Sequence, residues 1–347
     1  MVPVMLQATL TRHPHGITAI DADYIRPGMA AAHLIEHGGR AAFVDVGTNH
    51  SVPRLLAALA ALGIARSAVD FVFLTHVHLD HAGGAGALMR ELPSARAVVH
   101  PRGGPHLADP ARLIAASIAV YGEARYRELY GDLVPVPRER MVLMQDEQRF
   151  DLAGRELLTI DTPGHALHHY SIVDTVHANV FTGDTFGLSY RELDTAAGAL
   201  AVPTTTPTQF DPEQLIASID RLLGHSPRAA YLMHFSRVTG LQRLGESLKH
   251  QIWELAAIAR RHARSPAREE AIRRDMRALW LELARGHGVT LAEASIDAIL
   301  GKDLDLNAQG LAAWLDRVDR AGRGGRDSGD DGSGSGGSSG SGDGKSS

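Results

Sequence analysis

Short apolar runs alternate with longer amphipathic stretches over residues 1–240 of the chain. The run VDFVFLTH at 69–76 is almost continuously apolar, which is typical of a strand covered on both faces. The stretch SVPRLLAALAALGI at 51–64 spaces its apolar residues along one helical face, with Ser51 as N-cap and Gly63 at its end. This alternation predicts a layered α/β or α+β domain with helices outside the sheets.

The same pattern locates the other elements of this region. Strands are predicted at 16–24, 31–39, 40–47, 95–101, 155–165, 170–184 and 229–235. Helical segments are predicted at 82–92 and 110–133. The second helical segment carries three tyrosines and interrupts the succession of strands, so we treat it as an insert.

Beyond residue 240 the spacing of apolar residues is helical. Amphipathic helices are predicted at 241–263, 267–288 and 304–321. Trp253, Trp280 and Trp314 fall at helical spacing in this region and are expected in the core. The last residues are almost entirely Gly, Ser and Asp, a composition that cannot bury a core and predicts disorder. The predicted units are a catalytic domain at 1–240, a helical extension at 241–321 and a tail at 322–347.

The amino-acid composition excludes several kinds of site and mechanism. The chain has 347 residues, a net charge of −5 and no cysteine, which excludes disulfides, zinc–thiolate sites and a cysteine nucleophile. The acidic balance argues against a broad nucleic-acid-binding surface. The N-terminus lacks the basic start of a signal peptide, and no segment reaches the roughly 18 apolar residues of a membrane span. A cytoplasmic protein without membrane or nucleic-acid partners is therefore expected.

Candidate chemistry begins where the buried strand at 69–76 ends. The sequence THVHLDH places His76, His78, Asp80 and His81 within six positions. In extended backbone, His76 and His78 project to the same side and can reach one ion. Asp80 and His81 follow as the strand gives way to a helix, and they can turn toward a second position. A His-rich surface turn is the alternative interpretation of this stretch alone.

Three later strands also end in a ligand-type residue. The segments TPGH, TGD and LMH deliver, in order, His165, Asp184 and His234. Open α/β sheets collect their sites at such strand ends. Seven nitrogen and oxygen ligands are too many for one tetrahedral zinc and suit two metals that share a bridge.

This ordered set resembles the metallo-β-lactamase superfamily, and the glyoxalase II, lactonase and thioesterase branches are the nearest. The resemblance covers residues from 15 to 240 and implies an α+β fold, a four-layer αββα sandwich with metals at one edge between the sheets. It assigns one metal to His76, His78 and His165, the other to Asp80, His81 and His234, and the bridge to Asp184.

That assignment implies two divalent ions, with zinc foremost and iron or manganese as alternatives. The ions would share a hydroxide that attacks a carbonyl or phosphoryl centre. Asp184 and Asp80 are the candidate catalytic residues, and Asp80 could also accept and return a proton.

The number of residues between the ligand motifs helps to distinguish the branches of the superfamily. RNA-processing members carry a large inserted domain between the bridging Asp and the last His, whereas Asp184 and His234 are only 50 positions apart. The long gap between His81 and His165, together with the helical C-terminus, resembles the quinolone-signal-response thioesterase. The C-terminal helices would then cover the metal edge and form an apolar pocket, unless they only complete the fold or form a homodimer interface.

The resulting hypothesis is a metallohydrolase that cleaves an ester-type bond of a small molecule, with a thioester ahead of a lactone. Two alternatives stay open. One is a persulfide dioxygenase with a single iron on the same scaffold, and the other is a regulatory binding protein that retains a vestigial site.

Several polar residues near the motifs have no settled role. His168 and His169 could support a ligand or face the substrate, or could be packed without a chemical role. His106 could line a pocket. The loop at 202–215 is either a rim of the site or a plain connector, and Asp211 is predicted to cap the helix that follows.

Overall fold

The computed structural model describes the backbone of residues 8–327 and the side chains as far as residue 320. A seven-stranded mixed sheet forms the N-terminal half, in the spatial order β1 to β7. Its strands are β1 (Leu10–His13), β2 (Ile17–Asp21), β3 (Ala31–His37), β4 (Arg40–Val44), β5 (Val69–Leu74), β6 (Arg96–Val99) and β7 (Met141–Leu143). The first four strands pair antiparallel, and β4 to β7 run parallel.

A second sheet of six strands packs against the first, in the order β13-β12-β11-β10-β9-β8. Its strands are β8 (Gln148–Leu152), β9 (Arg155–Asp161), β10 (Tyr170–Asp174), β11 (Asn179–Gly183), β12 (Ala229–Leu232) and β13 (Ser236–Val238). Only β11 and β12 pair parallel. The inner faces of the two sheets share one apolar core that includes Phe73, Phe181 and Tyr231.

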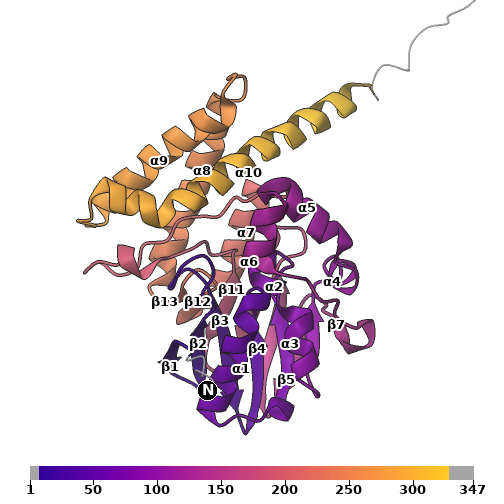
Figure 1. The fold of residues 1–347 in the computed structure, drawn as a ribbon. Coiled ribbons are helices and arrows are strands. Elements are labelled where there is room, and N and C mark those ends of the chain that lie inside the picture. Colours follow the sequence, from indigo (N-terminus) through magenta and orange to yellow (C-terminus); the bar gives the residue numbers. More distant parts are fainter. Residues whose placement is uncertain (1–7, 328–347) are drawn as a thin grey trace, which may run out of the picture.

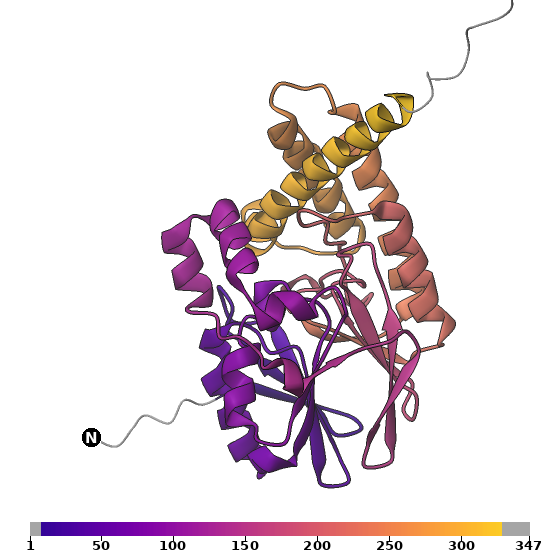
Figure 2. The same ribbon diagram turned by 90° about the vertical axis from the view of Figure 1, so that its right-hand side faces the viewer.

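Helices cover both outer faces of the sandwich. They are α1 (Val52–Leu62), α2 (Leu79–Ala82), α3 (Ala85–Glu91), α4 (Gly104–Ala108), α5 (Ala111–Tyr121), α6 (Glu123–Tyr130) and α7 (Pro212–Gly224). Apolar residues of α1 and α3 share a core with the first sheet, and those of α7 share a core with the second. Figure 2 shows the sheets between purple α1 and salmon α7. The predicted αββα architecture is confirmed.

Three long helices complete the chain: α8 (Leu241–Arg261), α9 (Arg268–Gly286) and α10 (Glu293–Asp327). They pack on one another above the sheets, and α8 also packs on α7 (Figure 1). Trp280 and Trp314 are buried there as predicted, whereas the prediction for Trp253 is wrong, because its side chain is exposed. Within the part of the chain that the structure describes, no helix is long and apolar enough to cross a membrane.

The structure differs from the predicted elements in several places. The strand predicted at 170–184 is divided into β10 and β11 by a turn at 175–178. Strands β1, β7, β8 and β13 were not predicted, and they are the four edges of the two sheets. The helix predicted at 110–133 is divided into α5 and α6 at Gly122, whose φ of 77° favours glycine. The last helix begins at Glu293 rather than at 304. The tail predicted at 322–347 was expected to be disordered, but residues 322–327 are helical and form the end of α10. From residue 328 onward the predicted tail lies outside the described residues.

The C-terminal helices allow a matched test of burial. Trp280→Ala removes a side chain that is 1% exposed and should lower the free energy of unfolding by about 3–5 kcal/mol. Trp253→Ala, at a position 43% exposed, should change it by no more than about 0.5 kcal/mol. Urea denaturation followed by circular dichroism measures both. Equal losses for the two variants would contradict this packing.

Candidate metal centre

Four strands of the two sheets end at the same edge of the sandwich. His76 follows β5, His78 immediately precedes α2, and Asp80 and His81 lie on that short helix. The strands of the second sheet contribute the other three, which follow β9, β11 and β12 in turn: His165, Asp184 and His234. The structure therefore brings all seven side chains singled out in the sequence into one cluster.

A glycine allows the two halves of the cluster to approach. Gly183 has a φ of 47° and ends β11 directly before Asp184. A Cβ at this position would lie 2.6 Å from both Thr75 Oγ1 and His169 Nε2. No larger residue fits there without displacing them, so the close packing at this strand end depends on glycine.

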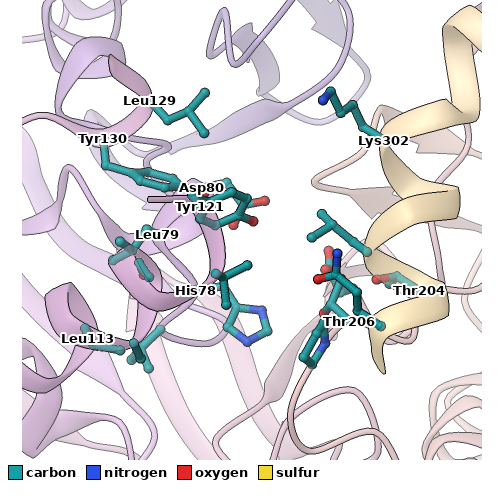
Figure 3. A pocket seen from close by; sticks show the side chains of 18 of the residues that line it. His78, Leu79, Asp80, Leu113, Tyr121, Leu129, Tyr130, Thr204, Thr206 and Lys302 are labelled. Carbon is teal, nitrogen blue, oxygen red and sulfur yellow. The ribbon is translucent and has the colours of Figure 1, made fainter. Parts of the chain in front are cut away.

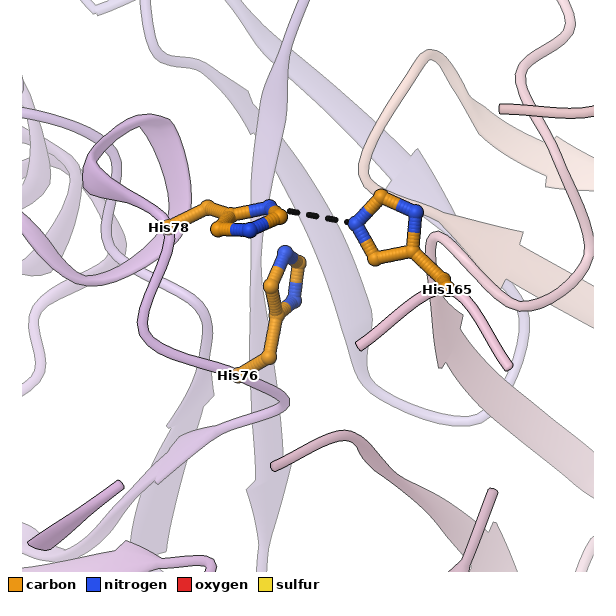
Figure 4. A group of neighbouring side chains, drawn as sticks. All are labelled: His76, His78 and His165. Carbon is orange, nitrogen blue, oxygen red and sulfur yellow. Dashed lines mark hydrogen bonds between the residues drawn. The ribbon is translucent and has the colours of Figure 1, made fainter. Parts of the chain in front are cut away.

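The first group consists of three imidazoles, shown in Figure 4. One ligand atom from each of His76, His78 and His165 lies within 4.8 Å of the others. His78 Nδ1 and His165 Nε2 are 3.1 Å apart. Three ring nitrogens converging in this way offer a site for one cation.

The second group combines two imidazoles with a carboxylate. Ligand atoms of Asp80, His81 and His234 also lie within 4.8 Å of one another, and His234 Nε2 is 3.3 Å from Asp80 Oδ2. Asp184 stands between the two groups. Its Oδ1 is 3.2 Å from His81 Nε2, and its Oδ2 is 3.3 Å from His165 Nε2. One oxygen of this carboxylate therefore faces each group.

Buried hydrogen bonds orient the rings. His81 Nδ1 lies 2.9 Å from Asp45 Oδ2, so this nitrogen donates to a buried carboxylate. The Thr75 hydroxyl donates to the same carboxylate at 2.8 Å and lies 3.2 Å from His76 Nδ1. His234 Nδ1 donates to the carbonyl of Met29 at 2.8 Å. With each Nδ1 engaged, these rings present Nε2 to the centre of the cluster.

His169 supports Asp184 from behind. The ring is buried, and its Nε2 accepts the backbone N–H of Asp184 at 3.2 Å. Its Nδ1 is therefore the donor, toward the hydroxyls of Thr162 at 2.9 Å and Thr185 at 3.1 Å. Of the roles left open for His169, this geometry favours that of a support for the carboxylate.

The charges within the cluster keep the carboxylates ionised. Burial acts to raise the pKa of Asp80, but His81 and His234 outweigh it and lower that pKa to about 2. His81 and His165 likewise hold the pKa of Asp184 well below its usual range against the effect of burial. Burial lowers the pKa of His234, but the hydrogen bond to Asp80 and the charges of Asp184 and Asp80 together outweigh this and raise it to about 8.

The imidazoles of the first group, by contrast, have lowered pKa values. Burial, reinforced by the neighbouring His81 ring, holds the pKa of His76 well below its usual value. Burial and His165 lower the pKa of His78 to about 3. Both rings are therefore neutral near pH 7, which is the form in which imidazole binds a metal.

The donor set fits divalent cations. Imidazole nitrogen and carboxylate oxygen are ligands that zinc, iron and manganese all accept. Three buried atoms of the cluster have no hydrogen bond among the described residues: His76 Nε2, His81 Nε2 and Asp184 Oδ1. A buried polar atom left unpaired costs about 1–3 kcal/mol, and cations bound in the cluster would satisfy all three.

A cavity of about 710 Å³ lies against the cluster (Figure 3). This volume is ordinary for a small-molecule site. Four of the seven ligand-type residues belong to its lining: His78, Asp80, Asp184 and His234. Much of the remaining wall comes from α5 and α6, from the loop after Thr204, from α10 and from the segment between β2 and β3.

Several residues whose roles the sequence did not settle lie around this cavity. His106 and His168 belong to its lining. Residues 206–209 line it too, so the loop at 202–215 forms part of the rim. The predicted cap is confirmed, because Asp211 accepts the backbone N–H of Gln214 at 2.9 Å.

Asp45 is the main residue of the centre that was not predicted from the sequence. It follows β4 directly, as the ligand-type residues follow their own strands, and its φ is 53°. The segment AFVDVG, an apolar run ending in a carboxylate, was the available signal. Thr75 was not predicted either, although it stands between β5 and His76.

Two mixed sheets between helices, with a buried His/Asp cluster at their strand ends, define a metal-binding α+β sandwich protein. The chain belongs to the Metallo-beta-lactamase superfamily, whose family model matches residues 25–234. This is a superfamily mostly of hydrolases, and divalent metal binding is the common property that the His/Asp cluster fits.

Known relatives match parts of the chain. A metallo-beta-lactamase fold-containing protein of Sulfurisphaera tokodaii is 28% identical over 170 residues, which cover 48% of this chain and 60% of that protein. A hydroxyacylglutathione hydrolase of Cronobacter sakazakii is 29% identical over 114 residues, or 33% of this chain and 32% of that enzyme. The chain thus spans less than two thirds of the length of these relatives.

Among solved structures, a metallo-beta-lactamase family protein from Thermus thermophilus has a TM-score of 0.61. The alignment covers 88% of this chain and 94% of that one, at 20% identity. This likeness extends over most of the chain and concerns the fold alone.

Asp45 offers a test of the support beneath the cluster. Asp45→Ala leaves His81 Nδ1 and the Thr75 hydroxyl without their shared acceptor, so metal affinity should fall by about 10- to 100-fold. Competition with a chromophoric chelator measures it. Asp70→Ala, which removes only a partly exposed partner of Arg40, is the control. Unchanged affinity in a folded Asp45→Ala protein would contradict this role.

Proposed function

We propose that this protein is a dinuclear metal-dependent hydrolase that cleaves an ester-type bond of a small molecule. The position of Asp184 carries the proposal. Its two carboxylate oxygens face different sets of imidazoles, at 3.2 Å from His81 and 3.3 Å from His165. A carboxylate placed in this way is suited to bridge two cations.

The residues divide between two ions. One ion would be held by His76, His78 and His165, the other by Asp80, His81 and His234, with Asp184 shared. Such a pair of divalent ions lowers the pKa of a shared water toward neutrality and polarises the oxygen of the bond under attack. Zinc is the first candidate, and the same ligands accept iron or manganese.

The protein's own groups supply the remaining functions. Asp80 lines the cavity as well as the cluster, so its carboxylate is placed to accept and return a proton beside the reacting bond. Asp45, Thr75 and His169 hold the ligands in orientation through buried hydrogen bonds. The cavity above the cluster gives a small substrate direct access to it.

A thioester is the preferred substrate and a lactone the second choice. The relative named hydroxyacylglutathione hydrolase acts, by that name, on an acyl derivative of a thiol. A hydrolase of this kind needs no cysteine nucleophile, and the chain contains none. Phosphodiesters are less favoured, because no broad basic surface accompanies the acidic net charge of −5.

Asp184→Asn tests the bridging role. The substitution replaces one carboxylate oxygen by an amide, so the metal content should fall from two ions per chain to one or fewer. Hydrolysis should fall by at least about 100-fold, because both ions position the reacting groups. Elemental analysis and a thioester assay measure these effects. His250→Ala, at an exposed position of α8, is the matched control and should change neither.

Metal analysis of the wild-type protein separates the alternatives. One iron per chain, with oxygen uptake on glutathione persulfide, would contradict the hydrolase proposal and favour a dioxygenase. Two ions per chain with hydrolysis of phosphodiesters alone would refute the preference for thioesters. A cellular phenotype that survives Asp184→Asn would favour a regulatory binding protein.

A further inference from the structure

Helix α5 is an apolar helix that the core of the protein leaves uncovered. All of its residues except Arg112 and Ser117 are apolar, yet none of its side chains is buried. Four of them pack partly against the main core: Leu113, Ile114, Ile118 and Tyr121. α5 therefore still exposes apolar surface, at Ala116 and Val120 among others, and a contiguous exposed apolar surface commonly marks a binding surface.

Part of this surface of α5 is a wall of the cavity. Four lining residues of α5 recur at helical spacing and form one mostly apolar stripe: Leu113, Ala116, Ser117 and Val120. Arg112 and Tyr121 line the cavity beside this stripe. Val120 is 49% exposed and Ile25, another lining residue, is 42% exposed. The small side chains of Ala116 and Ser117 lie in the middle of the stripe and leave room beside the helix.

The opposite wall has a different character. Apart from Leu306, the lining residues of α10 are polar or charged: Lys302, Asp303, Asp305 and Gln309. Figure 3 shows Lys302 on one side of the cavity and Leu113 and Leu129 on the other. Asp303 accepts the hydroxyl of Tyr190 at 3.1 Å, so this wall carries fixed polar groups. Two such walls suit an amphipathic molecule.

We propose that the cavity selects an ester or thioester with an extended apolar acyl chain, which lies along the α5 stripe while its carbonyl reaches the His/Asp cluster. The proposal rests on the proposed hydrolase function and names its substrate class. The cavity is continuous with the cluster through His78 and Asp80, so one molecule can contact both. Its polar leaving group would then face α10.

A series of acyl chains tests the proposal on the metal-loaded protein. N-acetylcysteamine thioesters with acyl groups of two to twelve carbons differ only in the apolar chain. Each methylene buried in an apolar site contributes about 0.8 kcal/mol, so kcat/KM should rise by up to about fourfold per methylene until the stripe is filled. A profile that is flat, or that favours the acetyl group, would overturn the proposal.

A matched pair of variants locates the chain on α5. Ala116→Trp fills the middle of the stripe and should shift the optimum to shorter acyl groups, with a loss at least tenfold greater for the decanoyl than for the butanoyl thioester. Ala119→Trp, on the same helix but outside the lining, should leave the profile unchanged. Identical profiles for the two variants would place the chain elsewhere.

Two further measurements separate this proposal from the proposed function. If chain length matters only on the alcohol or thiol side of the bond, the acyl orientation is wrong although the hydrolase stands. If no ester or thioester is cleaved, the hydrolase proposal fails, and binding of decanoate by calorimetry then tests the stripe alone. Decanoate binding that Ala116→Trp weakens at least tenfold supports the stripe, and equal binding refutes it.

Discussion

The structure depends on the burial of imidazoles and carboxylates at one edge of the β-sandwich. Most of these groups are closed off from water, so they need a partner inside the protein or a bound cation. Asp45 satisfies the outer nitrogen of His81 and the Thr75 hydroxyl, and the Met29 carbonyl does the same for His234. The inner atoms of the cluster are left for cations, and this division between outer and inner partners gives the centre its metal-binding character.

The two sheets supply different parts of this centre. The first sheet delivers the compact motif between His76 and His81 from a single strand end, whereas the second contributes one side chain from each of three strands. The groups meet only because the sheets pack face to face through a shared apolar core. Gly183 shows how closely the sheets approach at this edge. A larger residue there would collide with the His169 ring and the Thr75 hydroxyl, which lie behind Asp184.

The cavity is assembled from segments that are remote in the sequence. α5 and α6 belong to the long insert between His81 and His165, and α10 belongs to the C-terminal extension. Both contribute lining residues, so the regions outside the ligand motifs shape the space in which a substrate would lie. The stripe on α5 is mostly apolar and the lining residues of α10 are mostly polar, so the two regions give the cavity two different sides.

The sequence alone determined a layered domain, most interior strands and the seven ligand-type residues, because buried strands and strand-end ligands leave local patterns in the order of residues. The αββα arrangement followed from the resemblance that the ordered ligand-type residues carry. The tertiary structure alone decided the rest. The four unpredicted strands are sheet edges, which are paired on one side only and so carry a weak apolar signal. The partnership of Asp45 with His81, and the meeting of α5 with α10 around one cavity, depend on contacts between distant segments that no local pattern records.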